Sequence, residues 1–542
     1  MSIMTNPIPS IASQTSVLEA KQRLSQSLLW TLQRNFFAQQ GIQAWSQRIV
    51  PQYITSNPFI ARAYAKIVLS FLQEAIACEN LNSTPSHTKA PFYIIELGAG
   101  SGRFAYYFLK QFLATIQHSV LKNISFKYIM TDFADRTIDY WQAHSYLQPF
   151  VNQNYLDFAH FDVEQFQEIV LKKSGEILSP ETIKKPIIVL ANYFFDSIPQ
   201  DAFYIKEGQI HEWLITLLSP QHETNLSDPE LLDRVIVDFS CQPINKNYYN
   251  DADLDGLLND YSKRLVETVI PFPIAALQCL RYFRQLSQDR LLVLSGDRGY
   301  TCDEALEGLQ KPEIRIHGSF SMMVNYHALG EYVLRQGGQT LHPQCGHSHL
   351  NISAFILGNS SNGWVETHRA YTETIEQFGP DDFFTLKEGF EKIYNSYTLP
   401  QLLAYLKLSG WDHIIFLGCF PRLLDQIGAI TQLERQQLYQ AIQQVWNIYY
   451  PIGEQHDLAF SLGVLLFGIQ YYAEALDFFQ LSINDYGLDA STLVNMSQCH
   501  YNLGQLDTAL LYINQALELD QTLEMAKSMR NKIQAEIDRS MR

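Results

Sequence analysis

The stretch from residue 92 to residue 103 constrains the fold of this chain more than any other. It reads FYIIELGAGSGR, an apolar run that stops at Glu96 and continues into a loop with three alternating glycines, Gly98, Gly100 and Gly102. A second apolar run, residues 104–109, keeps a broad apolar face and predicts a helix. The stretch therefore predicts a strand, a tight loop and a helix. Glycines without Cβ let the loop approach a ligand, which the free N–H groups at the helix start would face.

The spacing of the glycines indicates the kind of ligand. A dinucleotide-binding loop has Gly-x-Gly-x-x-Gly, whereas this loop has Gly-x-Gly-x-Gly with Glu96 two residues ahead of it. An acid so close to the loop suits a ligand with a cationic end better than a bare phosphate. The pattern resembles that of S-adenosylmethionine-dependent methyltransferases, whose cofactor carries an ammonium and a sulfonium. It predicts that Glu96 and the three glycines bind this cofactor; the alternative is an ordinary glycine-rich turn.

Acids also follow the next two predicted strands. Asp132 ends the strand of residues 126–131, where an acid accepts hydrogen bonds from ribose hydroxyls in nucleotide-binding folds. Asp162 follows the strand of residues 158–161, and the resemblance implies that it binds the adenine amino group. For both acids the alternative is a helix cap. We expect both to be cofactor-binding residues.

The fourth predicted strand, residues 186–191, is a nearly continuous apolar run, as expected for a parallel strand covered on both faces. It leads into residues 192–199, NYFFDSIP. Ligands of open α/β sheets bind at the carboxyl ends of the strands, so this peptide should face the methyl donor. Asn192 is a candidate for cofactor binding and for catalytic positioning, and Asp196 is a candidate catalytic carboxylate that orients the acceptor and takes its proton. The alternative for Asp196 is a capping residue.

Several segments together resemble the MidA-like methyltransferases, a family that includes the mitochondrial complex I assembly arginine methyltransferase. The matching segments are residues 54–58, 96–103 and 191–199, with weaker matches at 297–300, 324–329 and 378–384. Three positions depart from the family pattern: Tyr193 replaces an acid, and Ser319 and Met323 stand in place of an aspartate and a histidine. The resemblance implies methyl transfer to a protein, with arginine as the acceptor.

Two other functions are compatible with parts of the pattern. A non-catalytic scaffold could keep the fold, and even the cofactor, while using its C-terminal repeats for binding; Tyr193, Ser319 and Met323 favour this alternative. An NAD-dependent oxidoreductase is disfavoured by the glycine spacing.

The C-terminal part shows an internal repeat. Ala475 and Ala509 lie 34 residues apart (509 − 475), with matching small and apolar residues around each. This spacing is typical of tetratricopeptide repeats, in which small residues allow paired helices to pack closely. Residues 385–542 are therefore predicted to be all-helical and tetratricopeptide-like, and to bind a protein or peptide. The alternative is a small helical end-cap.

The predicted fold class is thus α/β, a Rossmann-like methyltransferase sheet with N-terminal helices and a helical insertion, followed by an all-α domain. At 542 residues the chain is long enough for two or three domains. The predicted parts are a flexible tail at 1–15, an N-terminal helical segment at 16–89, the cofactor-binding domain at 90–360 with its insertion at 218–288, and the helical domain at 385–542.

Composition excludes several classes of function. A net charge of −17 disfavours binding to nucleic acid phosphates. No apolar run is long enough for a membrane span, and no secretory signal is recognised. Seven cysteines without a Cys-x-x-Cys pair predict buried, reduced thiols. We expect a cytoplasmic protein, with a mitochondrial location as the alternative.

No metal is expected, and a polar loop is the preferred interpretation of a cluster of four residues, His342, Cys345, His347 and His349.

Overall fold

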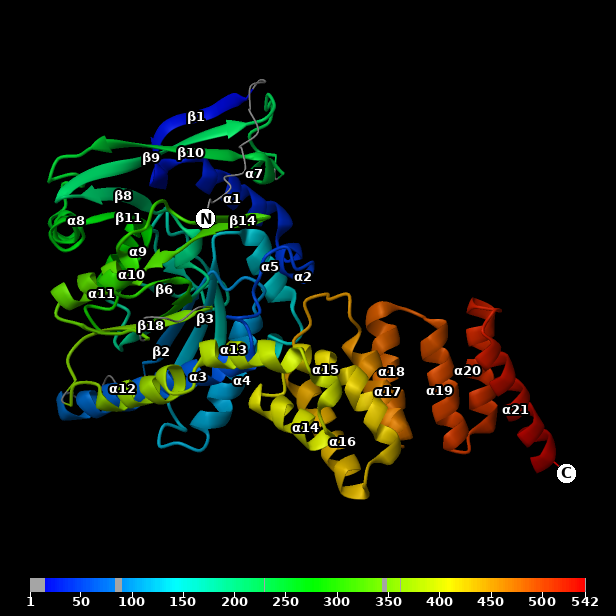
Figure 1. Cartoon of the computed structure of the whole chain (residues 1–542). Coiled ribbons are helices and arrows are strands. Elements are labelled where there is room, and N and C mark those ends of the chain that lie inside the picture. Colours follow the sequence, from blue (N-terminus) through cyan, green and yellow to red (C-terminus); the bar gives the residue numbers. More distant parts are fainter. Residues whose placement is uncertain (1–14, 83–89, 229, 344–348, 361, 542) are drawn as a thin grey trace. The chain divides into compact units, whose positions relative to one another are not determined.

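The computed structural model describes residues 15–82, 90–228, 230–343, 349–360 and 362–541. The chain divides into two compact units, Met1–Phe384 and Thr385–Arg542 (Figure 1). The predicted tail at 1–15 lies outside the described residues except for its last position.

A seven-stranded sheet forms the centre of the first unit, counted over the residues that the structure describes. The five strands β12, β7, β2, β3 and β4 are parallel, and β18 is antiparallel to its neighbours β12 and β17. The chain runs from β2 outward through β3 to β4 and then returns to β7 on the other side of β2. The carboxyl ends of β2 and β7 therefore form the topological switch point at which open α/β sheets bind ligands. In spatial order the strands are β17 (Gln339–Leu341), β18 (Asn351–Leu357), β12 (Leu291–Asp297), β7 (Ile187–Asn192), β2 (Phe92–Leu97), β3 (Phe126–Asp132) and β4 (Leu156–His160).

Helices cover both faces of this sheet, which explains why its central strands are apolar throughout. Successive residues point to opposite faces: Ile95 and Leu97 join a core with residues of α9 and α11, while Tyr128 packs on Phe108 of α4 on the other face, with 5.3 Å between ring centroids. The helices around the sheet are α3 (Pro58–Asn82), α4 (Arg103–Ile116), α5 (Asp135–Ala143), α6 (Gln148–Asn152), α8 (Ala252–Arg264), α9 (Ile274–Leu286), α10 (Asp303–Leu306), α11 (Tyr326–Arg335) and α12 (Val365–Tyr371).

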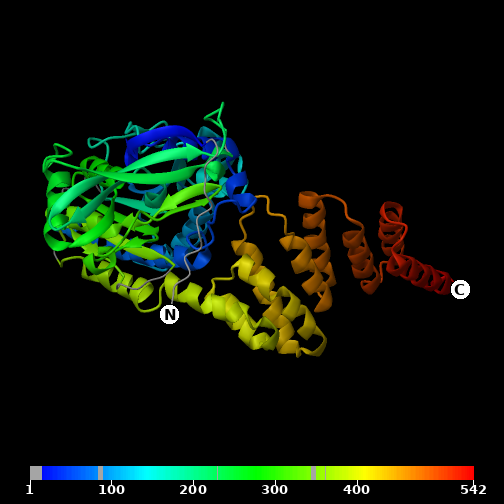
Figure 2. The ribbon, with the colours of Figure 1, turned by 45° about the horizontal axis from the view of Figure 1, so that its top comes forward.

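A second, antiparallel sheet has five strands within the described residues (Figures 1 and 2). It corrects two predictions. Residues 16–23, expected to begin a helix, form β1, because Ser16 pairs with Ser219 some two hundred residues later. The insertion at 218–288, expected to be helical, contributes two strands as well as helices. The strands are β1 (Ser16–Arg23), β9 (Gln209–Ser219), β8 (Asp201–Lys206), β11 (Glu267–Phe272) and β10 (Ile236–Pro243).

Strands β8 and β9 form a hairpin. Its two turn residues, Glu207 and Gly208, have φ angles of 48° and 77°, as a two-residue type I′ turn requires. The remaining short elements of this unit are α1 (Leu28–Gln40), α2 (Gln43–Ser46), α7 (Leu231–Arg234), β5 (Ile169–Val170), β6 (Ile177–Leu178), β13 (Gly299–Tyr300), β14 (Ile314–His317), β15 (Ser319–Met322) and β16 (Val324–Asn325).

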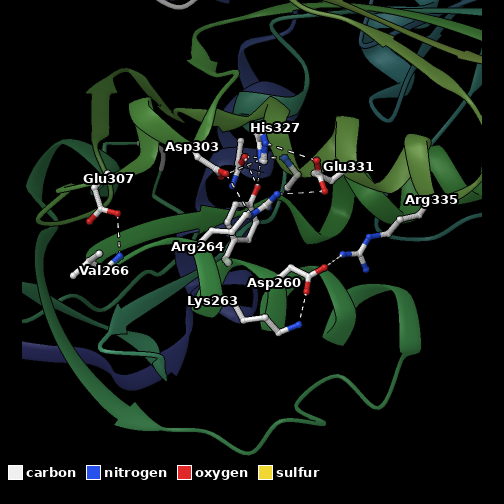
Figure 3. A network of polar contacts seen from close by, with 12 residues as sticks. Asp260, Lys263, Arg264, Val266, Asp303, Glu307, His327, Glu331 and Arg335 are labelled. Carbon is white, nitrogen blue, oxygen red and sulfur yellow. Dashed lines mark hydrogen bonds and ion pairs between the residues drawn. The ribbon is translucent and has the colours of Figure 1, made fainter.

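A polar network ties α8, α10 and α11 together (Figure 3). His327 lies at its centre: its Nδ1 atom is 2.9 Å from the Tyr261 hydroxyl and 3.6 Å from Asp303 Oδ1. Arg264 pairs with both Asp303 and Glu331, at 3.3 and 3.6 Å. Burial lowers the pKa of His327, so its ring is held mainly as a neutral hydrogen-bonding partner. The network connects helices of the layer between the two sheets.

The second unit is entirely helical over its described residues. Side-chain caps define several helix starts; Thr431 and Glu434, for example, form a reciprocal capping box at α16. Helix α13 spans the boundary between the two units. The helices are α13 (Pro380–Glu391), α14 (Leu399–Leu408), α15 (His413–Gln426), α16 (Gln432–Ile448), α17 (Leu458–Gly468), α18 (Tyr472–Tyr486), α19 (Ala490–Asn502), α20 (Leu506–Leu519) and α21 (Glu524–Ser540).

Two successive helix pairs, α17–α18 and α19–α20, carry the repeat seen in the sequence (Figure 2). Their first helices begin 32 residues apart (490 − 458) and their second helices 34 apart (506 − 472). Ala475 and Ala509 are fully buried where the helices meet. A Cβ on Gly463 would lie 2.7 Å from the ring of Phe479, so this position requires glycine for close packing.

Two further observations bear on the sequence predictions. Cys302 is disulfide-bonded and Cys241 is exposed, so the expectation of buried, reduced thiols is wrong at these two positions. Within the described residues, no helix combines the length and apolar character that crossing a membrane requires.

Candidate functional site

The glycine loop between β2 and α4 has the geometry that its sequence predicts. All three glycines have positive φ angles, 58° at Gly98, 52° at Gly100 and 77° at Gly102, which residues other than glycine rarely adopt. The Ala99 N–H donates to the carbonyl of Thr131, at 3.0 Å, and so fixes the loop to β3. Gly102 is the N-cap residue of α4.

Aromatic rings lie directly against this bare backbone. A Cβ on Gly98 would lie 2.9 Å from the ring of Phe194, and a Cβ on Gly100 would lie 3.0 Å from the ring of Trp45. The Gly100 carbonyl accepts a hydrogen bond from the indole of Trp141, at 2.9 Å. The absence of side chains on these glycines therefore leaves room both for the rings and for a ligand beside them.

A cavity of about 320 Å³ opens at the carboxyl ends of β2, β3, β4, β7 and β12, within the size range of small-molecule sites. Gly102 is not part of its lining and serves as the helix cap instead. The other residues predicted for the site all line the cavity: Glu96, Gly98, Gly100, Asp132, Asp162, Asn192 and Asp196.

Glu96 is a buried acid on the cavity wall. Its Oε2 atom accepts a hydrogen bond from the Tyr128 hydroxyl, at 3.0 Å. Burial raises the pKa of Glu96 to about 8, and the hydrogen bond from Tyr128 opposes this only in part. Near neutral pH this side chain is therefore mostly protonated, and a cation placed beside it would favour the ionised form.

Asp132 lies at the tip of β3. Its Oδ1 atom accepts from the N–H of Ala134, at 2.9 Å, the N-cap residue of α5. Burial raises the pKa of Asp132 to about 7, against the hydrogen bonds from the backbone and the charge of Arg34. Asp132 thus stabilises the turn into α5 and also lines the cavity. Its two possible roles, capping the helix and binding the ribose, are therefore compatible.

Asp162, which follows β4, is engaged by Arg34 of α1. The guanidinium donates to both carboxylate oxygens, at 3.0 and 2.7 Å, and lies 4.4 Å from the centre of the Phe133 ring. Although burial acts to raise it, these bonds and one from the Glu164 N–H hold the pKa of Asp162 below its usual range. Since both oxygens are already bound, an adenine amino group at Asp162 would have to share them with Arg34.

Asn192, the last residue of β7, has an unsatisfied donor. Its Oδ1 atom accepts from the Tyr64 hydroxyl, at 2.7 Å, and Gly296 leaves the space for this pair, because a Cβ there would lie 2.9 Å from both oxygens. The Nδ2 atom is buried, and the described residues offer it no hydrogen-bond partner. An orphaned amide of this kind is costly unless a ligand accepts from it.

The next residue, Tyr193, has a left-handed backbone with a φ angle of 48°, which is rare for a bulky side chain. Its N–H donates to the carbonyl of Gly296, at 3.0 Å, and this bond to the neighbouring strand helps to hold the conformation. Tyr193, which stands where the family pattern has an acid, lines the cavity. Strained residues of this type concentrate at binding sites.

Asp196 and Asp297 form a pair of buried carboxyl groups. Burial and the charge of Asp196 raise the pKa of Asp297 well above its usual range, so Asp297 retains a proton. Burial also raises the pKa of Asp196, but only to about 6, because hydrogen bonds from Ser197 and Asp297 and the charge of Arg298 oppose it. Above this pH Asp196 is an ionised carboxylate on the cavity wall.

The N-terminal segment of residues 33–56 forms one side of the cavity. Gln33 of α1 donates to the Ser197 carbonyl, at 2.9 Å, and accepts from the Phe320 N–H, at 2.8 Å. Gln52 accepts from the Ser101 hydroxyl, at 2.7 Å. This segment is therefore hydrogen-bonded to the glycine loop, to the peptide after β7 and to β15.

These features can be compared with known proteins. The model of a family described as "Putative S-adenosyl-L-methionine-dependent methyltransferase" matches residues 75–356, more than half of the chain. The chain belongs to this family. Its cofactor is accordingly S-adenosylmethionine. No curated protein matches it.

Three solved structures share only low similarity with this methyltransferase. An uncharacterized protein from Burkholderia thailandensis has 12% identity and a TM-score of 0.38, covering 64% of this chain and 90% of its own. A "likely methyl transferase" from the same organism, bound to S-adenosyl-homocysteine, has 13% identity and a TM-score of 0.34, covering 63% and 95%. The magnesium protoporphyrin IX methyltransferase of Synechocystis PCC 6803, also with S-adenosyl-homocysteine, has 8% identity and a TM-score of 0.26, covering 60% and 99%.

The cavity fits S-adenosylmethionine. A buried acid, Glu96, would hold the ammonium, and the glycine loop offers bare backbone beside it. Asp132 would accept from ribose hydroxyls, since the carboxylate of this residue lies in the cavity lining at the tip of β3. The orphaned Nδ2 of Asn192 supplies the donor that the bound molecule would satisfy.

Sequence reasoning missed several residues of this site. Asp297 ends strand β12 and Arg298 follows it, at the same sheet edge as the predicted acids, so the rule that identified Asp132 would have found them. The contributions of Gln33 and Trp45 have no local signal, because their place depends on tertiary packing. Ser319 lines the cavity, whereas Met323 does not.

The predicted absence of a metal site concerned a cluster that the structure describes only in part. Cys345 and His347 lie outside the described residues. His342 is partly buried, its Nδ1 atom is 2.9 Å from the Ser353 hydroxyl, and desolvation lowers its pKa to about 4. Over the described residues, no three His, Cys, Asp or Glu side chains are grouped so as to hold a metal ion.

Proposed function

We propose that this protein is an active methyltransferase that modifies a protein substrate recruited by its C-terminal helical unit. The observation that carries the catalytic part is the position of Asp196, an ionised carboxylate in the same cavity as the cofactor-binding residues. The recruitment part is supported by the successive helix pairs of residues 458–519, which we interpret as tetratricopeptide-like repeats.

The mechanism follows from the groups around the cavity. The bound cofactor supplies a methyl group on a positively charged sulfur, already activated for displacement. Glu96, the glycine loop and Asp132 would hold this cofactor. On transfer of the methyl group to the acceptor's lone pair, the electron pair of the carbon–sulfur bond would stay on the sulfur. Asp196 takes the proton that the acceptor loses, and Asn192 orients the reactants through its free N–H group.

Water exclusion comes from the aromatic side chains beside the glycine loop. Phe194 and Trp45 both contact this loop closely, and both line the cavity. A methyl group in transit would thus be surrounded by apolar rings, which keeps water from competing with the acceptor. The protein's contribution is alignment, desolvation and acceptance of a proton.

Arginine is the acceptor that the MidA-like resemblance implies. Asp196 supports a guanidinium acceptor, because a carboxylate pairs well with it. The test is incubation of the purified protein with methyl-labelled S-adenosylmethionine and a protein extract, followed by mass spectrometry of labelled peptides. Labelled protein with the wild type and none with Asp196→Asn, at unchanged cofactor affinity, is the expected result; equal labelling by both would refute the assigned role of Asp196.

A non-catalytic scaffold is the second candidate, and one observation favours it. Ser319 lines the cavity where the resemblance implies an acid, so one carboxylate of the acceptor side is missing. This candidate predicts binding of S-adenosylmethionine without transfer of label to any protein or small molecule.

A further inference from the structure

The cavity has two halves with different chemistry. Glu96, Asp132 and Asp162 lie at or just beyond the tips of β2, β3 and β4, three neighbouring parallel strands. These three tips span about 10 Å, because neighbouring strands are about 4.8 Å apart. This acidic half is the one that the cofactor would occupy. The other half lies over β7, β12 and the β14–β15 hairpin, and it is the space left for the methyl acceptor.

Arg298 stands at the far side of this acceptor half. It directly follows β12 and lines the cavity, half-buried. Its guanidinium makes no hydrogen bond or close ion pair with any residue that the structure describes. Its charge does act on Asp196, whose pKa it lowers. A guanidinium has five donors in a planar fork, so this side chain offers a complete bidentate site to an incoming anion.

Three further groups on the same wall reinforce this property. Arg315 of β14 lines the cavity and pairs only with its neighbour Glu313, at 2.5 Å, among the described residues. Ser319 and Ser321 of β15 line it too, and neither hydroxyl is hydrogen-bonded within the described part of the chain. In a protein with a net charge of −17, this wall gathers two cations and two free hydroxyls.

The anion that this wall would bind is not the carboxylate of the cofactor. That carboxylate shares a carbon with the ammonium, which belongs beside Glu96 on β2. Arg298 follows β12, two strands away, with β7 between them, a separation of about 10 Å at the usual strand spacing. The bound cofactor thus leaves Arg298 for a second molecule.

We propose that the methyl acceptor carries an anionic group, a carboxylate or a phosphate, which Arg298 binds at the β12 end of the cavity. Arg315, Ser319 and Ser321 complete this anion site. Phe37 and Trp45 on the opposite wall suit an apolar body attached to the anion. This inference rests on the proposed methyltransferase function and specifies its substrate class.

The test separates the two halves of the cavity. Binding of S-adenosylhomocysteine to the full chain is measured first by calorimetry. The protein saturated with it is then titrated with three probes of one shape: benzoate, phenyl phosphate and the neutral benzamide. We expect one of the two anions to bind at least about tenfold more tightly than benzamide, as a charge-assisted bidentate contact implies. Which anion binds identifies the acceptor's group as carboxylate or phosphate.

Variants locate the contact. Arg298→Gln should weaken the binding of the anion about tenfold or more. It should leave the affinity for S-adenosylhomocysteine within about twofold of the wild-type value. Arg298→Lys should keep part of the anion binding. Arg264→Gln, outside the cavity, is the matched control and should change neither affinity. Equal binding of benzoate, phenyl phosphate and benzamide would overturn the anion site. Loss of S-adenosylhomocysteine binding in Arg298→Gln would overturn it too, because Arg298 would then hold the cofactor. Failure of the wild type to bind S-adenosylhomocysteine would instead refute the proposed function.

Discussion

Glu96 should make cofactor binding release a proton. The pKa of this buried acid is raised to about 8 in the empty cavity, so at a pH of about 6.5 roughly 0.97 of the side chain is protonated. An ammonium beside it favours the ionised form, and the proton leaves. The ligand's own α-amino group is already charged at this pH, so it takes up almost no proton. The expected release from Glu96 is therefore about 0.9 proton per ligand bound.

The assay is calorimetric titration with S-adenosylhomocysteine in buffers of different ionisation enthalpy. The slope of the observed enthalpy against buffer enthalpy gives the number of protons released. Asp132, whose pKa is raised to about 7, can also contribute, but it does so equally in wild type and in Glu96→Gln. The difference between the two proteins isolates Glu96 and should be close to one proton. An identical slope for both would refute the placement of a cation at this acid.

The same reasoning fixes how affinity depends on pH. Below the pKa of Glu96, wild-type affinity should rise about tenfold for each pH unit, because the ionised form binds the cation. Glu96→Gln should lack this rise. Near pH 8 the variant should be weaker by about 1.5–3 kcal/mol, the value of a charge-assisted hydrogen bond. Near pH 6.5 the gap should nearly close, since the wild type spends about 2 kcal/mol on deprotonation there.

Three further predictions concern single positions. Gly98→Ala should weaken the binding of S-adenosylhomocysteine more than about tenfold, because its Cβ would displace the ring of Phe194. Gly175→Ala is the control, because it also places alanine at a positive φ but its Cβ meets no atom within 4 Å. Both variants should lose a similar stability, about 1–2 kcal/mol, but Gly175→Ala should keep the affinity unchanged. In a methyl-transfer assay, the wild-type rate should rise with pH through about 6, where Asp196 ionises. Asp196→Asn should lose this rise, and its kcat should fall about a hundredfold or more. A pH-dependent rise that persists in the variant would exclude Asp196 as the base. Gly463→Leu should overpack the contact with Phe479 and lower the free energy of unfolding of the C-terminal unit by about 1–3 kcal/mol, which lowers its melting temperature. Ligand affinity should not change. An unchanged melting profile would contradict the packing described.

The central sheet could be predicted because its signals are local. Residues 92–97 and 187–192 form strands where the sequence has apolar runs ending in loops. In parallel strands both faces are buried, so the composition of each run is sufficient to identify it. The acids at the strand tips then follow from the rule that ligands bind at the carboxyl ends of such strands.

The antiparallel sheet could not be predicted in the same way. Strand β1 is half exposed, and its conformation is determined by pairing with β9, far away in the sequence. Its spacing of apolar residues also fits a helical face, so local pattern alone gave the wrong element. The acceptor half of the cavity was missed for a related reason, since Arg315 and Ser319 reach it only through the folding of the β14–β15 hairpin.

The attachment of Gln33 to the peptide after β7 and to β15 has a practical consequence for the laboratory. An expression fragment cut at residue 90, where the central sheet begins, would retain all seven of the described strands of that sheet and could look complete by circular dichroism. It would nevertheless lack Arg34, Trp45 and Gln52, which line the cavity. Inactivity of such a truncated version would say nothing about the intact protein, and screens for substrates or inhibitors should start from the intact chain.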